Sequence, residues 1–196
     1  MKPLPGLQVT GPWTRLHRSE ASPLAAFLTE AEREAVARRT AGARGPAPLW
    51  VPPTSGAWGG RFTPPQGPGS LYLASDLATC LDEVAHHHAR ACQASLGTPP
   101  GARATFRPLR FEVEGRFADA SADRRKRLHA PEDYGPSWAY GLRARADGWD
   151  GVHYRSVRHR GGWCLAVYRE QAVHFLEGTW GAVILEWDGV RSVRIA

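Results

Sequence analysis

Three side chains of different chemistry recur at equal spacing in the first half of the sequence. Arg61 ends a glycine-rich approach, Tyr72 follows eleven residues later, and Glu83 lies eleven residues beyond Tyr72. A guanidinium can clamp phosphate with its planar fork of N–H groups, and a tyrosine ring can stack on a flat aromatic group. A carboxylate can bind ribose hydroxyls and stabilise a developing positive charge. The trio therefore suits a ligand with phosphate, an aromatic ring and a sugar, although a lone Gly-Arg pair is also typical of a surface charge.

Three adjacent histidines, His86, His87 and His88, are a weaker candidate for chemistry. Neighbouring side chains on a helix point about 100° apart, so the three rings cannot share one metal ion. Glu83 and His87 could supply two ligands, but the sequence offers no obvious third or fourth. We therefore predict a site without metal. The sequence also has no G-x-x-x-x-G-K-[ST] phosphate loop, no G-x-S-x-G elbow and no H-E-x-x-H motif.

A loop, a strand and a helix must position the trio. Residues 42–70 contain seven prolines and seven glycines, which predicts a long loop. Residues 71–74 are expected to form a short strand. Ser75 or Asp76 then caps a helix that runs to about Gln93, with Glu83 near the boundary between core and solvent. The side chains of this helix expected to face the core are Leu77, Leu81, Val84 and His88.

The rest of the sequence predicts strands with a few interspersed helices, which is typical of a single α+β domain. Residues 1–14 are expected to be an irregular lead-in, and residues 15–196 the domain itself. The capping box Thr29–Glu32 predicts a helix that ends near Gly42, and another helix is expected over 137–146. Strands are expected over residues 109–114, 152–154, 163–168, 182–187 and 190–195. Asp188-Gly189 predicts a hairpin with a type I′ turn between the last two strands.

The composition excludes several classes of protein. The chain has 196 residues, of which 42% are hydrophobic and 22% charged, as in one ordinary globular domain. No run approaches the roughly 20 apolar residues of a membrane helix, and the N-terminus lacks the apolar segment of a secretory signal. The three cysteines, Cys80, Cys92 and Cys164, have no C-x-x-C spacing, so neither a disulfide framework nor a zinc knuckle is indicated. A cytoplasmic location is expected.

The formal net charge of +6 raises the question of a nucleic-acid partner. However, 23 of the 25 basic residues are arginine, a bias also typical of a GC-rich genome. The one dense cluster is Arg124–Arg127, and Asp119 and Asp123 lie beside it. This mixture favours a solvated helical face over a phosphate-binding patch.

Three ordered stretches of the sequence resemble the RES domain family, which is named for an arginine, a glutamate and a serine. The first, Arg15-Leu16-His17-Arg18 with Ser22-Pro23-Leu24, is similar to the family's R-V-H-R…P-L opening. The second, from Gly60 to Val84, resembles its G-R-F…P…G-x-L-Y-x-A-x-S…A-x-x-E-x pattern. The third, from Trp149 to Arg158, resembles its D-G-[IV]-x-Y-x-S segment. Together they span residues 15 to about 168.

This resemblance implies an ADP-ribosyltransferase-like β core with peripheral helices. It implies a toxin that cleaves the nicotinamide–ribose bond of NAD+, by hydrolysis or phosphorolysis, and so arrests growth. Glu83 and Arg61 match the family's catalytic positions, Tyr72 and Ser156 its substrate-binding positions, and Arg15 a further ligand contact. NAD+ is then the substrate, and no cofactor is expected. The expected partner is an Xre-type antitoxin, and the chain is expected to form either a homodimer or a hetero-oligomer with this antitoxin.

The chain departs from the family pattern at two places. Thr63 stands where an acidic residue is often found, which is expected to alter hydrogen bonding within the loop. An alanine-rich helix around residues 30–41 is inserted before the loop, and this leaves open whether Arg15 or Arg18 contacts the ligand.

The chemistry of NAD+ agrees with a site built on one carboxylate. Nicotinamide in NAD+ is already cationic and leaves without protonation, through an oxocarbenium-like transition state that Glu83 could stabilise. Ser156 is expected to orient its neighbours, because the sequence shows no histidine–acid pair to activate it as a nucleophile. Two other functions stay open: an ADP-ribosyltransferase acting on a protein, and a nucleic-acid-binding module that uses Arg124–Arg127.

Overall fold

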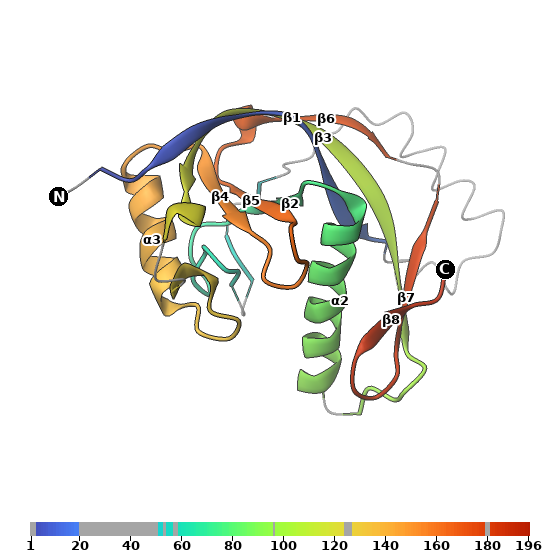
Figure 1. Cartoon of the computed structure of the whole chain (residues 1–196). Coiled ribbons are helices and arrows are strands. Elements are labelled where there is room, and N and C mark those ends of the chain that lie inside the picture. The colour runs from blue at the N-terminus through green and yellow to red at the C-terminus, as the bar shows by residue number, and fades with distance from the viewer. Residues whose placement is uncertain are drawn as a thin grey trace.

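The structure is a computed structural model, and one mixed β-sheet with two longer helices forms its framework (Figure 1). It describes residues 3–19, 51–52, 54–56, 59–95, 97–123, 127–178 and 181–196. The strands are β1 (Gly6–Arg18), β2 (Leu71–Ala74), β3 (Arg103–Asp119), β4 (Gly151–Arg155), β5 (Trp163–Val167), β6 (Val173–Gly178), β7 (Val183–Trp187) and β8 (Ser192–Arg194). The helices are α2 (Leu77–Ala94) and α3 (Gly135–Ala146), with 3-10 turns at Ala120–Ala122, Arg127–His129 and Glu170–Ala172.

The sheet closes on itself through its two longest strands. Its order is β1-β2-β5-β4-β3-β7-β8, and β1 also pairs with β3 along its whole length. The hydrogen-bonded path from β1 through β2, β5, β4 and β3 therefore returns to β1. The pairing of β3 with β4 is parallel, while the other pairings in this ring are antiparallel.

The long strand β3 changes its buried face part-way along. Its buried positions are even-numbered up to Pro108 and odd-numbered from Phe111 to Phe117. The even-numbered side chains Ala104, Phe106 and Ala118 belong to one hydrophobic cluster, and the odd-numbered Phe111, Val113 and Phe117 belong to the other. Successive side chains of a strand point to opposite faces, so one strand contributes to both clusters. The pairing with β6 is irregular between Arg110 and Phe111, where the extra residue belongs to β6.

Helix α2 lies against the side of the sheet that carries β1, β7 and β8 (Figure 1). Asp76 caps it through a hydrogen bond from the Thr79 N–H to the Asp76 carboxylate, 2.8 Å long. His88 is buried, and its Nδ1 lies 2.7 Å from Ser192 Oγ on β8. The helix is thereby fixed at its start and in its second half.

The α+β class and most of the elements expected from the sequence are confirmed. The helices over 76–93 and 137–146 are α2 and α3, and within residues 51–70 the described residues form no helix or named strand. β6 was not expected from the sequence. The helix expected after Thr29 and residues 42–50 of the loop lie outside the described residues.

Three expectations are wrong. Residues 6–14 are not an irregular lead-in but belong to β1, because pairing with β3 outweighs the local glycine and prolines. Leu77 begins α2 and is 38% exposed instead of facing the core. The hairpin between β7 and β8 forms, but not through a type I′ turn at Asp188-Gly189, since that turn needs positive φ at both residues and only Gly189 has it.

Candidate active site

A cavity of about 280 Å³ lies between α2, strands β2, β4 and β5, and the turn at residues 59–61. Four of the five candidate residues line it: Arg15, Arg61, Tyr72 and Glu83. The fifth, Ser156, does not line the cavity but contacts Glu83 directly. The structure therefore brings together residues that are up to 141 positions apart in the sequence.

Arg61 reaches the cavity from the tip of a tight turn. Gly60 and Thr63 exchange both backbone hydrogen bonds, at 2.8 and 3.2 Å, so Arg61 and Phe62 form the turn. Glycine is required at position 60, because a Cβ there would lie 2.4 Å from the hydroxyl oxygen of Tyr72. Phe62 is fully buried under the turn and anchors it.

The Arg61 side chain is only 6% exposed, and backbone carbonyls hold its guanidinium in place. Its Nη1 donates to the carbonyl oxygen of Ala130 at 2.8 Å and to that of Leu128 at 3.4 Å, and the group lies 4.6 Å from the centre of the Tyr134 ring. No other described residue accepts a hydrogen bond from Nη2 or Nε. The guanidinium is thus fixed on one edge and can bind an anion with the other.

Tyr72 presents its ring to the cavity while its hydroxyl is bonded to the loop. The hydroxyl accepts a hydrogen bond from the Phe62 N–H at 3.2 Å and lies 3.1 Å from Thr63 Oγ1, which in turn lies 2.5 Å from Ser70 Oγ. Burial raises the pKa of Tyr72, so the phenol stays neutral. Thr63 thus joins the loop to β2 through neutral hydroxyls, where the family pattern often has an acid.

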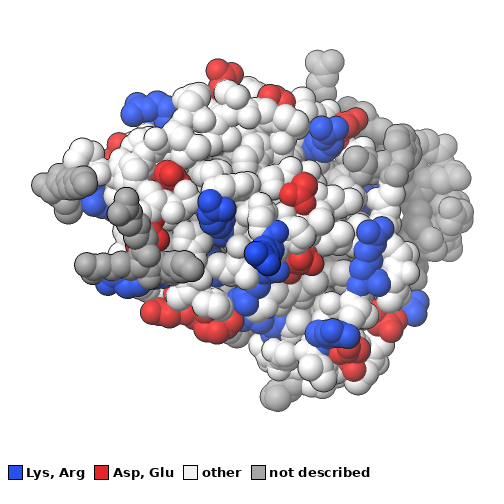
Figure 2. All heavy atoms as spheres, viewed as in Figure 1, with Lys and Arg blue, Asp and Glu red and all other residues white. Residues whose placement is uncertain are grey.

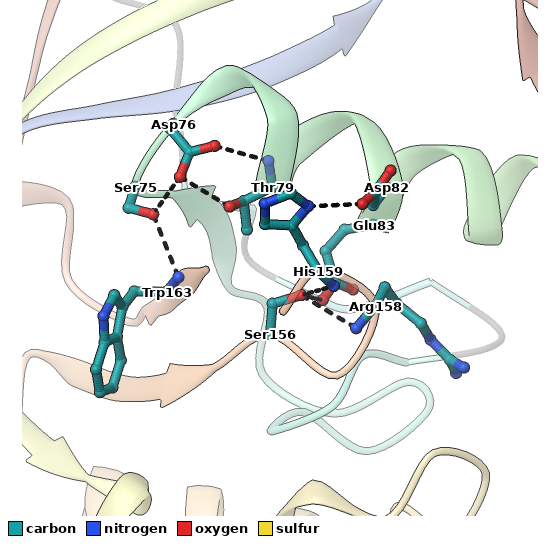
Figure 3. Close-up of polar contacts among 9 residues, drawn as sticks. All are labelled: Ser75, Asp76, Thr79, Asp82, Glu83, Ser156, Arg158, His159 and Trp163. Atoms are coloured by element: carbon teal, nitrogen blue, oxygen red, sulfur yellow. Dashed lines mark hydrogen bonds and ion pairs between the residues drawn. The ribbon is translucent and has the colours of Figure 1, made fainter. Parts of the chain in front are cut away.

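Ser156 fixes the carboxylate of Glu83 (Figure 3). Ser156 Oγ accepts hydrogen bonds from the N–H groups of Arg158 and His159, at 3.1 and 2.9 Å. Both of its lone pairs are then used, so its single proton is donated to Glu83 Oε1, 2.6 Å away. This leaves Glu83 Oε2 without a hydrogen-bond partner among the described residues. The hydrogen bond from Ser156 holds the Glu83 carboxylate in one orientation.

A histidine–acid pair lies next to Ser156, although none was expected. His159 Nδ1 is 2.7 Å from Asp82 Oδ2 and joins the loop after β4 to α2 (Figure 3). Only the backbone N–H of His159, not its ring, contacts the Ser156 hydroxyl. The pair therefore does not activate Ser156 as a nucleophile.

The structure places Arg15, not Arg18, at the cavity. Arg15 Nη1 donates to the carbonyl oxygen of Tyr72 at 3.2 Å, and burial lowers the pKa of its guanidinium. Arg18 is exposed and does not line the cavity. Arg15 therefore supports β2 beside the ring of Tyr72 and adds positive charge to the wall.

His87 also lines the cavity, one helical turn after Glu83. The sequence had indicated this pair only as two possible metal ligands. Sequence reasoning did not place Cys80, Tyr134, Tyr154 and Cys164 at the site, although all four line the cavity. These four come together only through the tertiary fold.

The thiols of the wall are not nucleophiles. Burial raises the pKa of Cys80 to about 11, and its Sγ accepts a hydrogen bond from the Leu16 N–H at 3.1 Å. Burial likewise raises the pKa of Cys164. Both therefore remain protonated at neutral pH and act as small apolar groups.

Among the described residues, no three His, Cys, Asp or Glu side chains gather where a metal ion could bind. None of the described helices has the length and apolar character needed to cross a membrane. Most of the basic cluster Arg124–Arg127 lies outside the described residues. On the face seen in Figure 2, basic and acidic side chains are interspersed, so this face carries no single basic patch among its described residues.

Comparison with models of protein families assigns the chain to a family. The model of the RES domain matches residues 35–185, most of the chain and including Arg61, Tyr72, Glu83 and Ser156. The chain belongs to the RES domain family. Arg15 lies before the matched segment, so its place at the cavity rests on the structure alone.

Solved structures show the same fold. The chain is similar to one in the crystal structure of the M. tuberculosis MbcT–MbcA toxin–antitoxin complex, with a TM-score of 0.54 and 14% sequence identity. The match covers 89% of this chain and 85% of the other. The RES-type fold expected from the sequence is thus confirmed. A search of curated proteins found no significant match.

Proposed function

We propose that this RES-domain protein is the toxin of a toxin–antitoxin pair and cleaves the nicotinamide–ribose bond of NAD+. The observation that carries the proposal is the Glu83 carboxylate, held by Ser156 in a cavity that also contains Arg61 and the ring of Tyr72. The family assignment and the fold shared with a chain of a toxin–antitoxin complex support it.

The reaction breaks the bond between C1′ of the ribose and the pyridinium nitrogen. The bonding electrons pass to that nitrogen, so nicotinamide leaves as a neutral molecule and needs no acid. The ribose carries positive charge in the transition state, and the fixed carboxylate of Glu83 stabilises it. An oxygen of water or phosphate then bonds to C1′ and loses its proton to solvent.

The binding groups have separate roles in this mechanism. The Tyr72 ring stacks on nicotinamide, and the free edge of the Arg61 guanidinium binds the phosphate next to the reacting ribose. The hydroxyl of Tyr72 is already bonded to the loop, so its ring is held in place before the ligand binds. Such preorganisation reduces the cost of ordering the site.

This function requires an antitoxin, because an unrestrained NAD+-consuming enzyme would harm its own cell, and the resemblance to the RES family favours one of the Xre type. The proposed antitoxin covers the entrance beside the glycine- and proline-rich loop that carries Arg61. The complex in the MbcT–MbcA structure is a precedent for such pairing on this fold.

The test is nicotinamide release from NAD+ by the purified chain, with products separated in the presence and absence of phosphate. Glu83→Gln keeps the shape of the side chain but removes its charge, so turnover is expected to fall roughly 10²–10³-fold, or about 3–4 kcal/mol. Glu114→Gln makes the same change at an exposed position on β3 and should leave turnover unchanged. Glu83→Gln turnover near the wild-type rate, in folded protein, would overturn the assignment.

The same products separate the alternatives. ADP-ribose indicates water as the acceptor, and its 1″-phosphate derivative indicates phosphate. Label transferred from NAD+ to protein would instead support a protein ADP-ribosyltransferase. Growth arrest on expression of soluble wild-type protein, but not of soluble Glu83→Gln, is the outcome expected of a toxin.

A further inference from the structure

A second cavity, of about 520 Å³, adjoins the first along the second half of α2. The two cavities share Gly59, His87 and Tyr134 in their walls. A molecule too long for the first cavity can therefore continue into the second. At about 280 Å³ the first cavity lies just below the range of roughly 300–1,000 Å³ that is usual for small-molecule sites.

One face of α2 forms a continuous wall of both cavities. Glu83, His87, Arg90 and Ala94 are spaced by four, three and four residues, so they lie on the same side of the helix. With a rise of 1.5 Å per residue, Arg90 lies roughly 10 Å beyond Glu83 along the axis. Figure 1 shows this half of α2 extending away from β2, at which the helix begins.

Arg90 supplies the charge of the second cavity. No carboxylate is among the described residues that line it, and the guanidinium of Arg90 makes no hydrogen bond or ion pair with another described residue. The acidic residue Glu132 lies near Arg90 but pairs with Arg158, since its carboxylate is 3.1 Å from Nη2 of Arg158. Ala91 and Ala94 have small side chains that leave room beside the guanidinium. The cavity is therefore suited to an anionic ligand.

His87 marks the passage between the cavities without adding charge. Desolvation lowers the pKa of its ring; the negative charge of Glu83 opposes this, and the positive charge of Arg90 adds to it. The ring is therefore neutral near pH 7. A phosphate that passes it meets Arg61 on one side and Arg90 on the other.

We propose that the second cavity binds the adenosine diphosphate portion of the dinucleotide, with Arg90 on the phosphate next to the adenosine and Arg61 on the phosphate next to the reacting ribose. This inference rests on the proposed function, in which the first cavity holds the nicotinamide and its ribose. The two halves of NAD+ are joined through the pyrophosphate, so the remaining half must lie in the space next to the first cavity.

The experiment measures binding of ADP to the full chain by calorimetry, which needs no turnover. Arg90→Gln removes the charge at an exposed helical position and should weaken ADP binding about ten- to hundredfold. Ala91→Trp fills the cavity without a change of charge and should abolish binding. Arg107→Gln, at an exposed position of β3 outside both cavities, is the matched control and should leave binding unchanged.

Nicotinamide release provides the second measurement. Arg90→Gln is expected to raise KM for NAD+ by about tenfold and leave kcat within about twofold, because Arg90 lies far from the broken bond. ADP that fails to bind wild-type protein at millimolar concentration, or binds all variants equally, would overturn the inference even if NAD+ is cleaved. ADP binding with the expected pattern, but without nicotinamide release, would support the second cavity and contradict the proposed cleavage.

Discussion

Arg61 and Glu83 line one cavity from two different elements, a turn and a helix, and the two walls hold their charged groups in different ways. Arg61 is 6% exposed at the tip of a turn, and it donates hydrogen bonds to the backbone of the segment opposite it. Glu83 lies on a capped helix, is half-buried, and contacts the single hydroxyl of Ser156. The wall formed by the turn at residues 59–61, called the turn wall, depends on Arg61 for its own structure. The wall formed by α2, called the helix wall, does not depend on Glu83 in this way. Substitutions at the two walls should therefore separate stability from activity.

Arg61→Ala is expected to have the largest combined effect. It removes the donor to the carbonyl oxygen of Ala130, whereas the carbonyl oxygen of Leu128 keeps a hydrogen bond from Ser137 Oγ at 3.0 Å. One unpaired acceptor costs about 1–3 kcal/mol, which lowers Tm by about 2–12 °C. NAD+ cleavage should fall at least about 10²-fold, because the phosphate also loses its guanidinium. Thermal unfolding and nicotinamide release measure the two effects.

Two controls sharpen this comparison. Arg107→Ala removes an exposed arginine of β3 and should change Tm by little. Glu83→Gln should keep the wild-type Tm to within a few degrees, since the amide oxygen can still accept the Ser156 proton. A Tm for Arg61→Ala equal to that of the wild type would show that the turn wall does not depend on Arg61.

Ser156→Ala is expected to have an intermediate effect, on the helix wall. The carboxylate of Glu83 loses its fixed orientation, so kcat should fall about 10- to 50-fold while KM for NAD+ changes little. The N–H groups of Arg158 and His159 also lose their acceptor, at a cost of about 1–2 kcal/mol. Ser156→Thr keeps the hydroxyl and should restore most of the rate. A fall in stability without any fall in kcat would assign Ser156 a purely structural role.

The sequence predicts those parts of the fold that local chemistry determines. Asp76 caps α2 and the alternation in β3 is visible over residues 109–113, because both depend on neighbouring residues. β1 is not predictable in this way. Pro12 and Gly11 suggest an irregular segment, yet Gly11 pairs with Val113, 102 residues away. Strand formation here depends on a distant partner rather than on local propensity.

The same distinction applies to the candidate site. Arg61, Tyr72 and Glu83 lie within 23 residues, so their types and spacing could be weighed together. The bond between Ser156 and Glu83 joins residues 73 positions apart, and the resemblance to the RES family, not the spacing, indicated Ser156. The second arginine-lined cavity had no sequence signal, because it forms only where α2 passes Gly59 and Tyr134.

Asp82→Asn is expected to have the smallest effect, although Asp82 is the neighbour of Glu83 on the helix wall. Its contact with His159 joins two side chains that are 51% and 34% exposed, and such surface pairs contribute at most about 1 kcal/mol. Ser156 would still be held by two backbone N–H groups, so turnover should stay within about threefold of the wild-type rate. Nicotinamide release by Asp82→Asn and Glu83→Gln, compared at equal concentrations of folded protein, measures the difference. If Asp82→Asn lost as much activity as Glu83→Gln, the His159–Asp82 pair would belong to the reacting groups, and the helix wall would no longer depend on a single carboxylate.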